Sequence, residues 1–183
     1  MDRTTTTLLL TILATSCAKM PPASAALPED WDPQTIAAAH ANLQSPGGVV
    51  GTLVFRAAGE GLAIDGSITG LDPGAHGFHV HETGSCEPPG FESAGSHFDP
   101  TSEAHAGPTA TAHHLGDLGN IDADADGRAE VHAIASKLSL DATHAGSILG
   151  RTIVVHAKAD DLRSQPGGDA GDRIACGVIV ATQ

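Results

Sequence analysis

Basic residues are scarce in this sequence of 183 residues. Nine Lys and Arg stand against 22 Asp and Glu, which gives a formal net charge of −13 at pH 7 with histidine neutral. Nucleic-acid binding draws much of its affinity from cations placed on phosphates, so this balance argues against a nucleic-acid partner. An anionic substrate would also be repelled on average, and its site would need a local basic group.

Long hydrophobic runs are also missing. The apolar run at residues 8–14 is too short to cross a membrane, and the tetrapeptide that ends at Cys17 resembles the cleavage box of a bacterial lipoprotein. We therefore expect an exported protein of the cell envelope or periplasm, anchored to a membrane through lipid on Cys17. An ordinary secretory peptide cut after Ala23 or Ala26 is the alternative. These features divide the chain into a signal peptide at 1–16, a flexible tether at 17–34 and a folded domain at 35–183.

Cysteine is limited to three residues. If Cys17 carries lipid, Cys86 and Cys176 remain as a pair, and an oxidising compartment would allow them to form a disulfide bond. Two free thiols in the core are the alternative from cysteine arithmetic alone.

Helical patterns are few, and short apolar runs between turn residues predict β-strands instead. The runs lie at residues 35–43, 49–56, 62–69, 77–81, 129–135, 151–156 and 174–181. They predict an all-β sandwich or flattened barrel. Two long segments, 82–119 and 157–173, are predicted loops, and loops of that length in a compact domain usually carry function.

Histidine is abundant, with eleven residues, and its spacing predicts two adjacent metal sites. His79 and His81 alternate with apolar residues on one predicted strand and therefore project from the same face. His156 ends a second apolar run. Four imidazoles without a thiolate suit copper, whereas three imidazoles with one carboxylate suit zinc at a closed structural site. The expected copper ligands are His79, His81, His97 and His156, and the expected zinc ligands are His97, His105, His114 and Asp117.

Five segments of the chain together resemble the copper-zinc superoxide dismutases. They are GFHVH (77–81), SAGSHFDP (93–100), HHLGDLGN (113–120), GRTIVVHAKADDL (150–162) and DRIACGVI (172–179). The resemblance covers about residues 35–182, and the long interval between Cys86 and His97 fits the exported bacterial branch. It implies a Greek-key flattened barrel of about eight antiparallel strands, one copper and one zinc per subunit, and dismutation of superoxide to O₂ and H₂O₂.

The resemblance also implies roles for individual residues. His97 would bridge the metals and hand a proton to superoxide, and Arg173 would guide the anion to the copper. Asp160 would link a copper-binding histidine to a zinc-binding one. Cys86 and Cys176 would form a disulfide bond that ties the metal loop to the last strand.

The sequence also allows two other functions for this chain. A non-catalytic copper-handling or metal-storage relative would use the same ligands, and a structural domain could reuse the sandwich as a scaffold. The pattern also leaves monomer and homodimer open. His76 is expected to bond to the backbone, and His113 is expected to face solvent beside His114. Surface positions are expected for His40, His132 and His144.

Overall fold

The computed structural model describes residues 37–182. The expected signal peptide, the lipid site at Cys17 and the tether lie outside the described residues. Within them, no helix is long and apolar enough to span a membrane.

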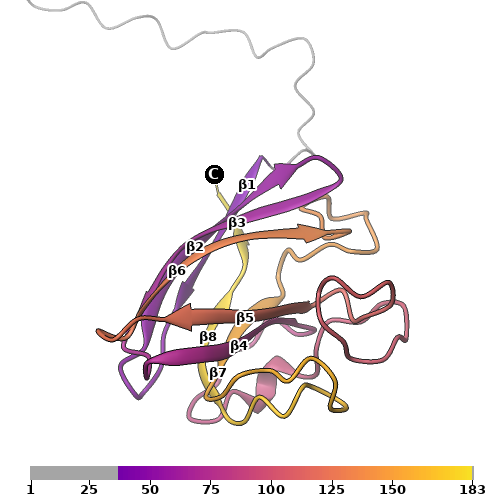
Figure 1. The fold of residues 1–183 in the computed structure, drawn as a ribbon. Helices are drawn as coiled ribbons and strands as arrows, with labels where there is room; N and C mark the ends of the chain where they lie inside the picture. Colours follow the sequence, from indigo (N-terminus) through magenta and orange to yellow (C-terminus); the bar gives the residue numbers. More distant parts are fainter. Residues whose placement is uncertain (1–36, 183) are drawn as a thin grey trace, which may run out of the picture. The chain divides into compact units, whose positions relative to one another are not determined.

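Two antiparallel sheets pack face to face and form the fold (Figure 1). One sheet has the strand order β6-β3-β2-β1-β9 and the other β5-β4-β7-β8. Some strands that are hydrogen-bonded neighbours within a sheet are therefore far apart in the sequence. A 3₁₀ turn, η1 (Glu92–Ala94), interrupts the first long loop. The prediction of an all-β Greek-key sandwich is confirmed. The strands are β1 (Ala38–Leu43), β2 (Val50–Ala58), β3 (Gly61–Thr69), β4 (Gly74–His81), β5 (Asp117–Ala123), β6 (Arg128–Ser136), β7 (Thr152–His156), β8 (Arg173–Val178) and β9 (Val180–Ala181).

Strand alternation separates the hydrophobic core from the functional side of the molecule. Phe55 on β2 and Ile64 on β3 are fully buried between the sheets, and Phe78 on β4 packs in the same cluster. On β4 the alternate residues His79 and His81 point to the opposite face. The long loops, residues 82–116 and 157–172, cover that outer face of the four-stranded sheet (Figure 1).

β5 is the strand that the sequence did not predict. Residues 117–119 were assigned to the end of a loop, yet Asp117–Ala123 pairs with β4 and alternates buried with exposed residues. Its four buried residues are Asp117, Gly119, Ile121 and Ala123. Only one of these is a large apolar residue, so the usual hydrophobic signature of a strand is absent.

The expected disulfide bond joins Cys86 to Cys176, with their Cα atoms 5.6 Å apart. It connects the first long loop to β8. Phe91, Ala94 and Val154 pack around Cys176 in a small buried cluster beside the main core.

Removing this disulfide is expected to destabilise the fold strongly. The bond closes a loop with a sequence separation of 90. In the chain-entropy description, a loop of that size contributes about 4–5 kcal/mol by restricting the unfolded chain. We expect the double variant Cys86→Ser/Cys176→Ser to lose that much unfolding free energy in urea titrations of the metal-free protein. Wild-type protein treated with a reductant should show the same unfolding free energy as the double variant. A urea midpoint equal to that of the untreated wild type in both samples would contradict this contribution of the disulfide.

Candidate metal centre

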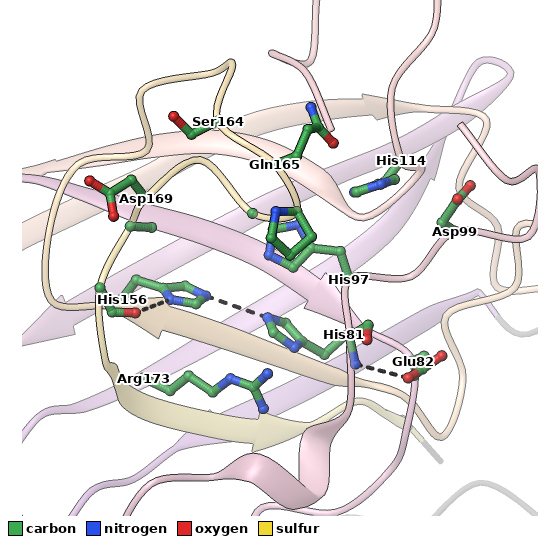
Figure 2. Close-up of a pocket in the computed structure, with 15 residues that line it drawn as sticks. His81, Glu82, His97, Asp99, His114, His156, Ser164, Gln165, Asp169 and Arg173 are labelled. Atoms are coloured by element: carbon green, nitrogen blue, oxygen red, sulfur yellow. Dashed lines mark hydrogen bonds between the residues drawn. The ribbon is translucent and has the colours of Figure 1, made fainter. Parts of the chain in front are cut away.

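Two groups of possible metal ligands lie side by side, and the first consists of His79, His81, His97 and His156. Three of its histidines come from the ends of paired strands. His79 and His81 lie on β4, and His156 ends β7, which pairs with β4. His97 comes from the long loop and is held opposite His81 by an isolated β-bridge. Each of the four offers a nitrogen, and these nitrogens lie within 4.8 Å of one another. Figure 2 shows the rings of His81 and His156 facing each other, with the ring of His97 nearby.

Hydrogen bonds set the orientation of three of these rings. Nδ1 of His81 donates to the carbonyl of Gly95 at 2.9 Å, and Nδ1 of His156 donates to that of Gly171 at 3.1 Å. Their unprotonated Nε2 atoms then face each other, 3.4 Å apart. His79 is turned the other way, because its Nε2 lies 2.8 Å from Asp160 Oδ2. The three free lone pairs therefore point into one space.

His79 Nδ1 provides the test of whether this group fits a metal. The atom is buried and has no hydrogen-bond partner among the described residues. An unsatisfied buried polar atom is costly in a folded protein and calls for an explanation. A cation at the centre of these four imidazoles would satisfy it, and copper has the highest affinity for nitrogen ligands among the divalent first-row metals.

The second group converges on the buried carboxylate of Asp117. Its Oδ1 lies 2.7 Å from His97 Nδ1, 3.0 Å from His105 Nδ1 and 3.2 Å from His114 Nδ1. The His105 contact lacks hydrogen-bond geometry, so this buried Nδ1 is also unsatisfied. Three imidazole nitrogens and one carboxylate, all buried or nearly so, fit a closed tetrahedral zinc site.

His97 belongs to both groups and joins them. Its Nδ1 is directed at Asp117, and its ring centroid lies 4.1 Å from that of His79 and 4.9 Å from that of His81. One imidazole with a nitrogen on each side can therefore face both metal positions.

Asp160 makes a second connection between the two groups. One carboxylate oxygen lies 2.8 Å from His79 Nε2 and the other lies 3.0 Å from His105 Nε2. The amide of Asn120 holds the backbone of Asp160 by two hydrogen bonds, at 2.7 and 2.9 Å. Carboxylates in this position fix the tautomer and orientation of metal-binding imidazoles.

Burial and hydrogen bonding keep three of the histidines and both carboxylates in the protonation states that bind cations at neutral pH. Burial lowers the pKa of His79 to about 4 and that of His156 to about 3, and it lowers the pKa of His81 as well. Burial would raise the pKa of Asp117 and Asp160, but hydrogen bonds from His97 and His79 outweigh it and lower both to about 2. Neutral imidazoles and ionised carboxylates are the forms that bind metals.

Arg173 lies beside the first group at the start of β8. Its guanidinium donates to the carbonyls of Phe91 at 2.8 Å and Gly95 at 2.7 Å, which fixes it in the wall of the pocket (Figure 2). The pocket has a volume of about 720 Å³ and also reaches His81, His97 and His156. Arg173 is the single cation among the described residues that line it, against three carboxylates, those of Glu82, Asp99 and Asp169.

The remaining histidines divide into one confirmed prediction, one error and three surface residues. His76 bonds to the backbone as predicted, with its ring nitrogens each 2.8 Å from a carbonyl oxygen, of His156 and Asp72. His113 was predicted to face solvent, but it is buried, and its Nδ1 lies 2.6 Å from the carbonyl of His114. His113 belongs to neither of the two groups of possible metal ligands. His132 and His144 are exposed, and His40 is partly exposed.

Sequence reasoning missed two residues that support the site, Asn120 and Gln165. Both use side-chain amides to bond to the backbone of a distant loop. Asn120 at least lies within the segment that resembles the dismutases, whereas Gln165 has no recognisable spacing to any ligand.

A two-layer β-sandwich with two histidine groups that share one imidazole defines a candidate dinuclear metalloprotein. Residues 49–179 match the family described as copper/zinc superoxide dismutase. The extracellular superoxide dismutase [Cu-Zn] of Onchocerca volvulus is 42% identical in an alignment 148 residues long, which covers 75% of this chain and 72% of that protein. A crystal structure of the clock protein EA4 has a TM-score of 0.74 and 37% identity over 81% of this chain and 96% of its own.

The chain therefore belongs to the copper/zinc superoxide dismutase family, a family of oxidoreductases. This membership agrees with the resemblance found in the sequence.

Proposed function

We propose that this protein dismutes superoxide to O₂ and H₂O₂ as an antioxidant enzyme of the cell envelope. Copper would be held by His79, His81, His97 and His156, and zinc by His97, His105, His114 and Asp117. The observation that carries the proposal is the convergence of imidazole nitrogens on both sides of His97, with Nδ1 of His79 buried and without a hydrogen-bond partner among the described residues. A bound copper supplies one-electron oxidation and reduction.

Arg173 is assigned to binding the substrate. Two of its N–H groups are used by the carbonyls of Phe91 and Gly95, and the remaining ones are free to donate to an anion. The chain carries a net charge of −13, which repels an anion such as superoxide on average. The fixed guanidinium of Arg173 attracts the anion locally and opposes this repulsion.

His97 is assigned to proton delivery. Asp117 fixes its Nδ1, and its Nε2 lies in the pocket wall beside Gly167. Dismutation oxidises one superoxide to O₂ and reduces a second, with the electron passing through the copper that the site would hold. Nε2 can take up a proton and donate it to the second superoxide, which leaves as H₂O₂ with its other proton from solvent. Asp160 keeps His79 and His105 in the required tautomers, with Nε2–H donated and Nδ1 unprotonated.

Export and lipid anchoring complete the proposal. The disulfide between Cys86 and Cys176 suits an oxidising compartment, and the relative from Onchocerca volvulus is named as extracellular. The anchor would be Cys17, after removal of residues 1–16. Mass spectrometry of the protein purified from membranes tests this directly, since lipidation adds acyl mass to a chain that begins at Cys17. A chain that begins after Ala23 or Ala26 would contradict it.

Copper retention separates the enzyme from a metal-handling relative. The chain loaded with one copper and one zinc is challenged with a copper(I) chelator during exposure to superoxide. An enzyme is expected to keep its copper through many turnovers. Rapid transfer of copper to the chelator, with superoxide consumed no faster than by the released metal, would favour the metal-handling function instead.

A further inference from the structure

Gln165 makes an unusual set of contacts with the backbone of a proposed zinc ligand. Its Oε1 accepts a hydrogen bond from the His105 N–H at 2.9 Å, and its Nε2 donates to the His105 carbonyl at 2.8 Å. Nε2 also donates to the carbonyl of Arg163 at 3.0 Å. The side-chain amide thus pairs with one residue as a neighbouring β-strand would. One donor and two acceptors around it fix which end carries the oxygen.

His105 needs such a support because of where it lies. His79, His81, His156 and Asp117 belong to strands, whose ladders position them. His105 lies in the long loop outside any strand. Among the described residues, its main-chain N–H and C=O make their hydrogen bonds to the side chain of Gln165 alone.

The residues that follow Gln165 lie against two imidazoles of the site, those of His97 and His105. A Cβ atom added to Gly167 would lie 3.1 Å from His97 Nε2, and one added to Gly168 would lie 2.8 Å from His105 Nε2. The latter would also overlap the carboxylate of Asp160. The backbone at 167–168 therefore lies against the ring of the shared His97 and against that of His105, and the side chain of Gln165 attaches this backbone to the loop that carries His105. Figure 2 shows Gln165 on the same side of the pocket as His97 and His114.

We infer that Gln165 is a positioning residue for zinc: it holds the backbone of His105 so that Nδ1 stays directed at the shared carboxylate of Asp117. The inference rests on the proposed function. Losing supports of this kind around metal ligands typically weakens metal binding by about 10- to 100-fold. We therefore expect Gln165→Ala to release zinc about 10- to 100-fold faster than the wild type, with copper retention unchanged.

The experiment follows zinc transfer from the copper- and zinc-loaded protein to a chromogenic chelator in excess. Gln165→Ala removes all three hydrogen bonds. Gln165→Glu keeps an acceptor for the His105 N–H but loses both donors, so its release rate is expected to lie between those of wild type and Gln165→Ala. Gln44→Ala makes the same chemical change at an exposed position at the end of β1 and should release zinc at the wild-type rate.

Two further readouts distinguish positioning from general destabilisation. With cobalt in place of zinc, the visible absorption bands of Gln165→Ala should shift, because the geometry of the ligands changes. The thermal midpoint of the metal-free protein should stay close to that of wild type. Zinc release at the wild-type rate from both Gln165 variants, with unshifted cobalt bands, would overturn the inference while leaving the proposed function intact. A wild-type protein that holds no zinc at all would overturn both.

Discussion

Replacing His79 with glutamine is expected to abolish superoxide dismutation. The Nδ1 atom of His79 is the buried nitrogen without a partner, and its Nε2 holds Asp160, which also contacts His105. Glutamine offers a neutral amide in place of an imidazole and is a poorer ligand for copper. The activity per chain should fall to that of adventitious copper, and metal analysis should show loss of bound copper. The measurement is superoxide consumption alongside copper content.

His132→Gln is the matched control for this result. His132 lies on the outer face of the five-stranded sheet with its side chain 74% exposed, where it contacts Asp65. The same substitution there should leave rate and copper content unchanged. Turnover by His79→Gln at the rate of this control would contradict the copper site assigned to His79, His81, His97 and His156.

Arg173→Ala is expected to lower kcat/KM by about 10- to 100-fold while copper and zinc remain bound, because fixed cations in a pocket raise the association rate of anions by factors of this order. The remaining rate should also depend less on ionic strength, since the local attraction for the anion is gone. The measurement is the dismutation rate across a series of salt concentrations, with metal content determined for each sample.

Two variants separate the local role of Arg173 from the loss of one positive charge. Arg56→Ala removes a cation from the exposed face of β2, where it lies 3.8 Å from Asp65, and should leave the rate nearly unchanged. Arg173→Lys should recover part of the rate, since an ammonium attracts anions but cannot reproduce the fork that bonds to Phe91 and Gly95. Equal losses in Arg56→Ala and Arg173→Ala would contradict a specific guiding role.

Much of the metal centre could be predicted, because alternation along a strand determines which side chains share a face. Alternation on β4 places His79 and His81 on one face, and the end of β7 brings His156 beside them. The same alternation predicted most of the strands, and the all-β fold is confirmed. The disulfide bond between Cys86 and Cys176 was predicted from the resemblance to the dismutases, because the number of cysteines alone also allowed two free thiols.

The parts that were missed depend on contacts that sequence spacing does not encode. β5 buries Asp117 and Gly119 beside a single large apolar residue, Ile121, so the apolar alternation that identifies a strand is weak. His113 is buried, and its ring contacts the carbonyl of the next residue in a loop, neither of which its place beside His114 in the sequence predicts. The amide of Gln165 reaches across 60 residues to His105, and no local motif predicts such a contact.

The most direct test of the proposed activity is the second-order rate of superoxide dismutation by the mature chain loaded with one copper and one zinc. We expect a rate near the diffusional ceiling of about 10⁸–10⁹ M⁻¹s⁻¹, a limit that superoxide dismutases are already known to reach. Such a rate would mean that Arg173 overcomes the repulsion from a net charge of −13. A rate no higher than that of an equal amount of free copper would contradict the assignment of this site to catalysis.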